Sequence, residues 1–151
     1  MKFGWSWSSS VVFLILNCSG VWAAGRESVF SDATVSSGKD ITLKIELPKG
    51  YKLSDSAPHR LELFDLGANR VVRTWRENSL RFPQMGLGKV PGSAKPYRLE
   101  GRIFVCDKID KRICVSLRAK QQIFSGGPVG QSVLEWKLSI PSGVQSSTGI
   151  R

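Results

Sequence analysis

Two cysteines have the residue type and spacing that could support covalent chemistry in this sequence. Cys106 and Cys114 lie at the inner edges of two runs rich in Ile, Val, Phe and Leu, within residues 98–124. Such β-forming runs on either side of a short polar turn predict a hairpin. If the pairing centres on Asp110, the two cysteines face each other with Cα atoms about 4.5–5.5 Å apart, a distance that a disulfide tolerates. The spacing therefore predicts a disulfide closed across a hairpin.

This disulfide has two interpretations, a structural staple and a reagent for thiol–disulfide exchange. The thiolate is the exchanging species and nearby positive charge favours it, but the connector 107–113 holds three basic and two acidic residues, so this effect is small. A staple across so short a loop would stabilise the fold by about 2–3 kcal/mol. Most disulfides of exported proteins are structural, so the residues alone favour the staple, and both interpretations stay open.

Other kinds of catalytic or metal site find little support. The single histidine, His59, follows Pro58 in an expected loop, has no partner for a Ser-His-Asp or Cys-His device, and is interpreted as a surface residue. The two cysteines that remain once Cys18 leaves with the expected signal peptide, together with one histidine, leave a zinc site one ligand short. The glycines lie at turns and form no phosphate-binding motif. We therefore expect neither a metal nor a small-molecule cofactor.

A strongly basic balance, with a formal net charge of +10, points to an anionic partner. The densest group of basic side chains includes interleaved aromatic residues: Arg70, Arg73, Trp75, Arg76, Arg81 and Phe82. Arginine beside aromatic residues can bind single-stranded nucleic acid, but an exported protein rarely meets that ligand. We expect a solvated basic face at Arg70, Arg73 and Arg76 that engages an anionic surface or an acidic protein, and not nucleic acid.

The first residues have the composition of an export signal. A basic start leads into the apolar run 11–16, which is too short to span a bilayer, and small residues follow at 23–25. We therefore expect residues 1–24 to be a cleaved signal peptide rather than a membrane anchor. Asn17 argues against lipoprotein cleavage before Cys18, because such sites want a small residue at that position. Cleavage leaves Cys106 and Cys114 as a pair in an oxidising compartment, periplasmic or extracellular.

Short alternating segments then predict the elements that position the pair. Residues 41–47, 61–64, 71–75 and 133–140 read as strands beside the hairpin, separated by turns rich in Gly and Pro. Residues 25–38 are expected to form a loose lead-in, 77–97 a weakly structured region with a brief strand at 80–82, and 141–151 a disordered tail. The pattern predicts one all-β domain over 39–140, an antiparallel immunoglobulin-like sandwich.

Two segments resemble a known family. The stretch CDKIDKRIC between two strands is similar to the N-terminal periplasmic domain of the thiol:disulfide interchange protein DsbD. The earlier stretch ITLKIELPKGYKLSDSAPHRLEL is similar to an LPxGYxLxxxAP segment of related domains, including those that end NHL-repeat proteins. The resemblance covers residues 35–140 and implies an immunoglobulin-like sandwich that takes electrons from a membrane partner. It implies that Cys106 and Cys114 exchange disulfides with periplasmic thiol proteins.

Our leading hypothesis is an exported thiol–disulfide exchange domain that acts through Cys106 and Cys114. A thiol-redox protein or a membrane electron donor would be its partner. The alternative is a non-enzymatic binding module with a structural disulfide, whose basic face at Arg70, Arg73 and Arg76 meets an acidic protein or anionic surface.

Overall fold

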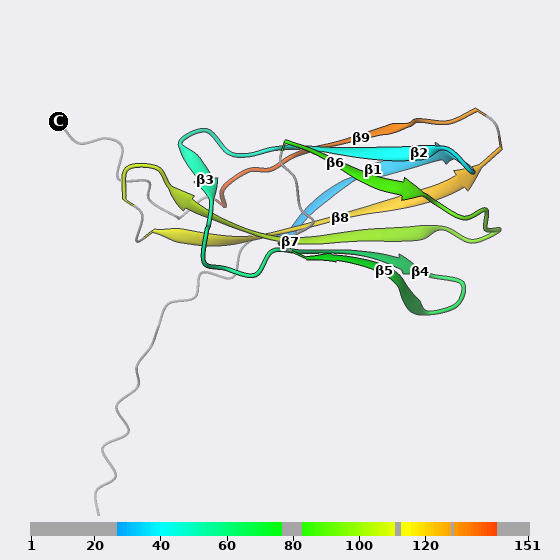
Figure 1. Ribbon diagram of the computed structural model, residues 1–151, viewed down its shortest axis with the longest axis horizontal. Coiled ribbons are helices and arrows are strands. Elements are labelled where there is room, and N and C mark those ends of the chain that lie inside the picture. Colours follow the sequence, from blue (N-terminus) through cyan, green and yellow to red (C-terminus); the bar gives the residue numbers. More distant parts are fainter. Residues whose placement is uncertain (1–26, 77–82, 111–112, 128, 142–151) are drawn as a thin grey trace, which may run out of the picture.

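The computed structural model describes residues 27–76, 83–110, 113–127 and 129–141, which form strands and connecting loops without a helix (Figure 1). The strands are β1 (Glu27–Ser36), β2 (Asp40–Glu46), β3 (Tyr51–Leu53), β4 (Arg60–Asp65), β5 (Arg70–Arg76), β6 (Gln84–Lys89), β7 (Tyr97–Asp107), β8 (Cys114–Gly126) and β9 (Val133–Lys137). The expected signal peptide, the brief strand at 80–82 and residues 142–151 of the tail lie outside the described residues.

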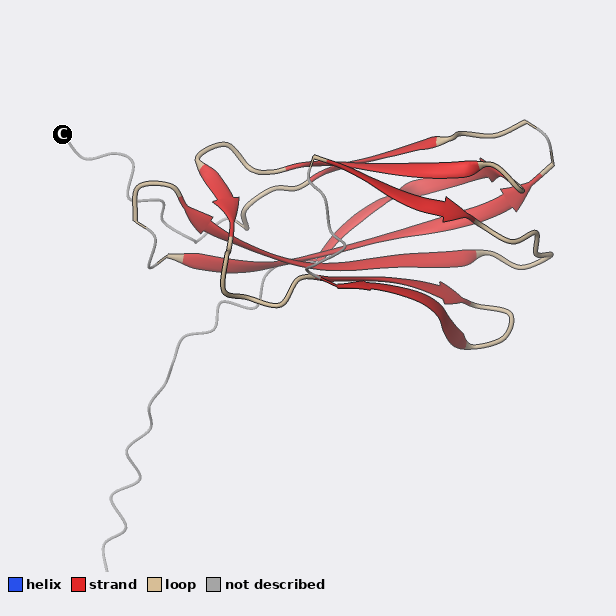
Figure 2. Cartoon of the chain, viewed as in Figure 1, coloured by secondary structure: helices blue, strands red, loops and turns tan. Residues whose placement is uncertain are grey.

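Two sheets pack as the layers of a sandwich, so the predicted all-β sandwich is confirmed (Figure 2). The larger sheet has the order β1-β8-β7-β4-β5, with β3 added at one end of β7, and the smaller sheet has the order β6-β2-β9. One cluster of buried apolar side chains fills the space between them. Its largest fully buried members include Trp136, Ile41, Leu43, Leu61, Leu63 and Leu99.

The strands with the clearest period-two patterns appear where the sequence places them. In β2, Ile41, Leu43 and Ile45 are buried while the residues between them are more exposed. In β9, Leu134 and Trp136 alternate with exposed neighbours in the same way. Apolar side chains on one face of a strand need a second sheet to cover them, so this alternation also sets which face points inward.

The expectation of a loose lead-in over residues 25–38 is wrong, because residues 27–36 form the ten-residue strand β1. The folded domain therefore starts well before residue 39. β1 runs parallel to β8, and its register shifts between Phe30 and Ala33. Such a bulge moves inward-facing residues out of step with a strict period of two. The strand therefore shows no clean alternation in the sequence, although Ala33 and Val35 are buried.

The region expected to be weakest also contains a strand. In β6, Met85 and Leu87 are buried, while Gly86 and Gly88 occupy the positions between and after them. Gly88 has φ of +72°, a conformation that favours glycine, and the β2–β6 register shifts beside it. These glycines therefore accommodate an irregular edge strand instead of breaking it.

Two strand pairs depart from the expected antiparallel arrangement. β1 pairs with β8 and β2 pairs with β9 in parallel, while the other pairs are antiparallel. The end of β1 also bridges toward β9, because Gln131 N–H donates to the Thr34 carbonyl over 2.8 Å. The Ser36 hydroxyl donates to the Gly130 carbonyl at 3.1 Å. β1 thus joins the two sheets along one edge.

A buried polar contact ties three strands together across the core. The Trp136 indole N–H of β9 donates to Gln121 Oε1 of β8 over 2.8 Å, and Gln121 Nε2 donates to the Ser31 carbonyl of β1, also at 2.8 Å. The Trp136 ring stacks on Phe30 with centroids 5.4 Å apart. A Cβ atom on Gly101 would lie 2.8 Å from this indole, so glycine at that position lets the ring approach β7.

Candidate functional site: a cross-strand disulfide on an outer sheet face

β7 and β8 form the predicted hairpin, and its last pair is Cys106 opposite Cys114. The Asp107 N–H donates to the Ile113 carbonyl over 2.9 Å, so Asp107 and Ile113, the pair next to the cysteines, are hydrogen-bonded. The cysteines therefore occupy a non-hydrogen-bonded pair, where facing side chains approach most closely. They form a disulfide with an S–S distance of 2.04 Å and a Cα–Cα distance of 4.0 Å. Both the facing register and the disulfide are confirmed.

The disulfide lies on the outer face of the larger sheet. Val105 and Val115, the neighbours of the cysteines, point into the core, so Cys106 and Cys114 point away from it. Cys106 is only 6% exposed, whereas Cys114 is an exposed residue. The bond is therefore not part of the core packing, and its more exposed side is that of Cys114.

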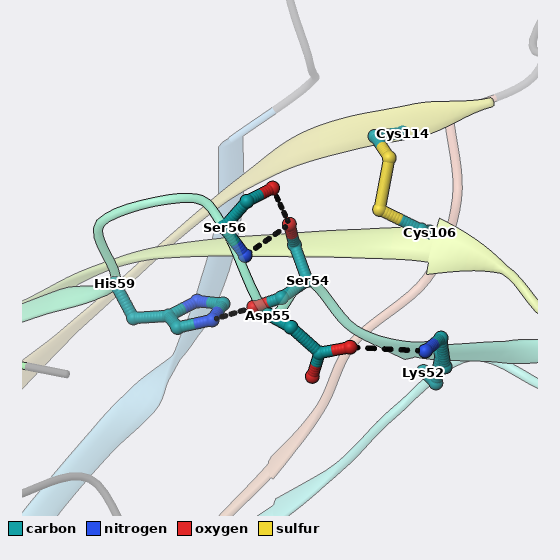
Figure 3. A network of polar contacts seen from close by, with 7 residues as sticks. All are labelled: Lys52, Ser54, Asp55, Ser56, His59, Cys106 and Cys114. Atoms are coloured by element: carbon teal, nitrogen blue, oxygen red, sulfur yellow. Dashed lines mark hydrogen bonds and ion pairs between the residues drawn. A yellow bond between two sulfur atoms is a disulfide. The ribbon is translucent and has the colours of Figure 1, made fainter. Parts of the chain in front are cut away.

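β3 covers the other side of Cys106. The register places Lys52 directly opposite Cys106, so Lys52, Cys106 and Cys114 form one row across three strands (Figure 3). The Lys52 ammonium lies 3.2 Å from Asp55 Oδ2. A cation beside a thiol favours the thiolate, and the carboxylate of Asp55 partly offsets it. The position of this lysine could not be predicted from the sequence, because β3 is three residues long and its partner strand is distant in the chain.

His59 is buried, which corrects its interpretation as a surface residue. Its Nδ1 atom accepts a hydrogen bond from the Phe104 N–H at 3.1 Å, so the proton of the neutral ring resides on Nε2. That Nε2–H donates to the Ser54 carbonyl at 2.9 Å (Figure 3). The imidazole thus links the segment between β3 and β4 to β7, close to the cysteine row, and its role in this geometry is structural.

Asp107 organises the connector between the cysteines. It is 2% exposed, and its Oδ1 atom accepts hydrogen bonds from the Ile109 N–H at 2.7 Å and the Asp110 N–H at 3.1 Å. The Lys108 N–H donates to the Gly50 carbonyl at 2.9 Å. An aspartate that bonds to backbone two and three residues on is typical of a tight turn. These contacts hold the start of the connector against β3, next to Cys106.

Tyr51 faces Asp107 across β3 and β7, and its hydroxyl has no hydrogen-bond partner among the described residues. Burial raises the pKa of this phenol, and the Asp107 charge raises the pKa further. An unfolded tyrosine ionises near about pH 10. The folded state keeps the phenol protonated to a higher pH than the unfolded chain does. The free energy of unfolding therefore falls as the pH rises above the pKa of the unfolded tyrosine.

Replacing Tyr51 with phenylalanine is expected to raise the free energy of unfolding by up to about 1 kcal/mol at pH 7, because an unsatisfied hydroxyl is removed. The gain should grow between about pH 10 and 11, where the variant has no phenol to ionise on unfolding. Urea unfolding of both proteins at these pH values measures the difference. A variant that is less stable than the parent at pH 7 would show that the hydroxyl has a favourable partner.

The structure does not gather Arg70, Arg73 and Arg76 on one face. Arg73 pairs with the buried Leu63, donates to the Leu87 carbonyl of β6 at 2.5 Å and lies over the Trp75 ring. It therefore bridges the two sheets. Arg76 pairs instead with the exposed Arg60 and points to the outer face, and Arg70 lies opposite Asp65 at the far end of β5. The three arginines thus occupy three different environments along one strand.

Within the described residues, no three side chains of His, Cys, Asp or Glu lie close enough together to hold a metal ion. No protein-family model matches this chain, and the comparison with curated proteins finds no match. The described part of the chain also contains no helix that is long and apolar enough to cross a membrane. The cross-strand disulfide is the feature of this site with a definite chemistry.

Proposed function

We propose that this protein is an exported thiol–disulfide exchange domain that passes electrons through Cys106 and Cys114 to thiol proteins of the periplasm. The observation that supports this function is a disulfide placed on an outer sheet face, apart from the core cluster, with one exposed cysteine. Reactive cysteines occupy partly exposed positions, whereas inert structural ones are buried. The resemblance of residues 106–114 to the DsbD N-terminal domain supports the same function.

Exchange proceeds in two balanced steps. A thiolate of a reduced dithiol donor attacks Sγ of Cys114, which breaks the S–S bond, forms a mixed disulfide and releases the Cys106 thiolate. The second thiolate of the donor then attacks the donor sulfur of the mixed disulfide and releases the Cys114 thiolate. The donor becomes a disulfide and the protein a dithiol, with two electrons transferred. The reduced pair next attacks a client disulfide through Cys114, and Cys106 resolves the mixed disulfide.

Neighbouring residues assist by position and charge. Lys52 lies opposite Cys106, the cysteine that leaves first, and its positive charge favours the Cys106 thiolate to the extent that Asp55 does not offset it. Asp107 and His59 hold the turn and the adjoining segment, so the cysteines stay opposite each other after reduction. The donor would be a thiol-redox protein or a membrane electron donor, and exchange needs no bound cofactor.

The reduction potential of the pair tests this proposal. We expect a value near or above about −230 mV, as in exchange proteins, when the purified protein is equilibrated in graded thiol buffers. A value below about −300 mV would identify a structural bond and contradict the proposal. That outcome would favour the second candidate, a binding module with a structural disulfide. Its specific support is a row of exposed arginines that the strand registers bring together on the outer face of the larger sheet, Arg76, Arg60, Arg102 and Arg118.

A further inference from the structure

Four arginines lie side by side on the outer face of the larger sheet. The register places Arg76 of β5 opposite Arg60 of β4, Arg60 opposite Arg102 of β7, and Arg102 opposite Arg118 of β8. All four are exposed, and directly paired residues point to the same face. Neighbouring strands are about 4.8 Å apart, so this arginine row extends over about 14 Å.

The surface is hollowed over the arginine row. A groove of about 530 Å³ is lined by all four arginines, with Phe104 and Pro58 on the side toward the disulfide. That volume lies within the range of small-ligand sites, about 300–1,000 Å³. A flat membrane surface would not fill such a groove, whereas a narrow ligand would. The groove is separate from the cysteine row, because Phe104 and Ser116 form the pair between them.

The carboxylates in the groove already have cationic partners. Glu62 pairs with Arg60 at 2.5 Å. Glu27 pairs with Lys120 at 2.6 Å, and Glu100 pairs with Arg98. The guanidinium groups of Arg102 and Arg118, by contrast, make no hydrogen bond or ion pair with any residue in the described part of the chain. Glu27 lies opposite Arg118 in the β1–β8 register, but its carboxylate pairs with Lys120. The middle of the row therefore presents two guanidinium groups that form no ion pair with the three carboxylates of the groove.

Like charges directly opposite each other on neighbouring strands destabilise a sheet. A bound dianion would remove that repulsion, and the planar guanidinium fork matches the oxygens of phosphate and sulfate in bidentate geometry. We propose that the groove binds a ligand with two or more phosphate or sulfate groups, and that Arg102 and Arg118 hold it. Arg60 and Arg76 extend the positive row for further groups of the same ligand. This site is independent of the redox function proposed above.

The test is isothermal titration of the purified protein with inorganic tripolyphosphate, in a buffer without divalent cations. The double variant Arg102→Gln/Arg118→Gln should bind at least about tenfold more weakly, since each arginine supplies charge-assisted hydrogen bonds. Its melting temperature without ligand should equal or exceed that of the parent, because the opposed charges are gone. The control Lys44→Gln/Lys137→Gln removes the same net charge from exposed lysines of the smaller sheet and should bind as the parent does.

Further ligands identify the source of the anions. Orthophosphate should bind at least about tenfold more weakly than tripolyphosphate, because it engages fewer arginines. A sulfated disaccharide that competes with tripolyphosphate would extend the ligand class to sulfated sugars and support the site. Equal weakening by both double variants would reveal a general charge effect and overturn the proposal. Binding to vesicles of anionic lipid without binding to tripolyphosphate would also overturn it, in favour of a membrane surface.

Discussion

Replacing Trp136 with alanine is expected to lower the free energy of unfolding by about 3–5 kcal/mol. The indole is 1% exposed, and it fills the space between β9 and the larger sheet, against Phe30 and Gly101. Truncation would leave a cavity there and would leave Gln121 Oε1 without its donor. Small domains have a total stability of about 5–15 kcal/mol, so this one change would bring the protein close to unfolding at physiological temperature.

Urea unfolding followed by circular dichroism measures this loss, because the signal does not depend on the removed fluorophore. Trp75→Ala is the matched control. That ring lies on the edge strand β5, is 9% exposed and makes no hydrogen bond with a described residue, so its loss should cost less. Trp136→Phe should fall between the two, since it keeps an aromatic ring beside Phe30 but removes the indole donor. An equal loss for the two alanine variants would contradict the central role of Trp136.

The elements that the sequence predicts well depend on local patterns. Neighbouring residues alone determine the alternation in β2 and β9 and the symmetric hairpin around Asp110. Each of these features appears in the structure. The disulfide followed from the hairpin alone, because a tight turn sets the register of both strands. For the same reason the candidate redox pair was visible from sequence before the sandwich was known.

The features that the sequence did not predict depend on pairing between distant segments. β1 was missed because its bulge disrupts the period-two pattern. Lys52 lies beside Cys106 only through the short strand β3, and the burial of His59 depends on two backbone partners from other segments. No local pattern encodes these registers.

The arginine row could not be predicted from the sequence for the same reason, because it depends on pairing between distant segments. Its members come from β5, β4, β7 and β8, and only their registers bring them together. The sequence instead suggested a cluster of arginines close together in the chain. Successive residues of a strand face opposite sides of the sheet, and Arg73 and Arg76 are three positions apart in β5. They therefore point to opposite faces.

Alkylation of variants that keep one of the two paired cysteines, made in a chain without residues 1–24 so that Cys18 is absent, should show the asymmetry of the pair. After reduction, the Cys114 thiol of the Cys106→Ser variant is expected to react with iodoacetamide at least about tenfold faster than the Cys106 thiol of the Cys114→Ser variant. The reason is access, since Cys114 is exposed whereas Cys106 is 6% exposed between Cys114 and Lys52. Rates in urea, where both thiols are accessible, should agree and serve as the control.

The same two variants separate a reactive pair from a staple. Under the proposed exchange, reduced Cys106→Ser should accumulate a mixed disulfide with a client disulfide such as oxidised glutathione, because Cys114 attacks it and no Cys106 thiol remains to resolve the product, whereas Cys114→Ser should not. The double serine variant should lose exchange and about 2–3 kcal/mol of stability, the entropic contribution expected for a loop with a sequence separation of 8. Because the bond lies on the outer face, its removal opens no cavity in the core. Equal alkylation rates for both cysteines in the folded protein would contradict attack at Cys114 and require a different order of exchange.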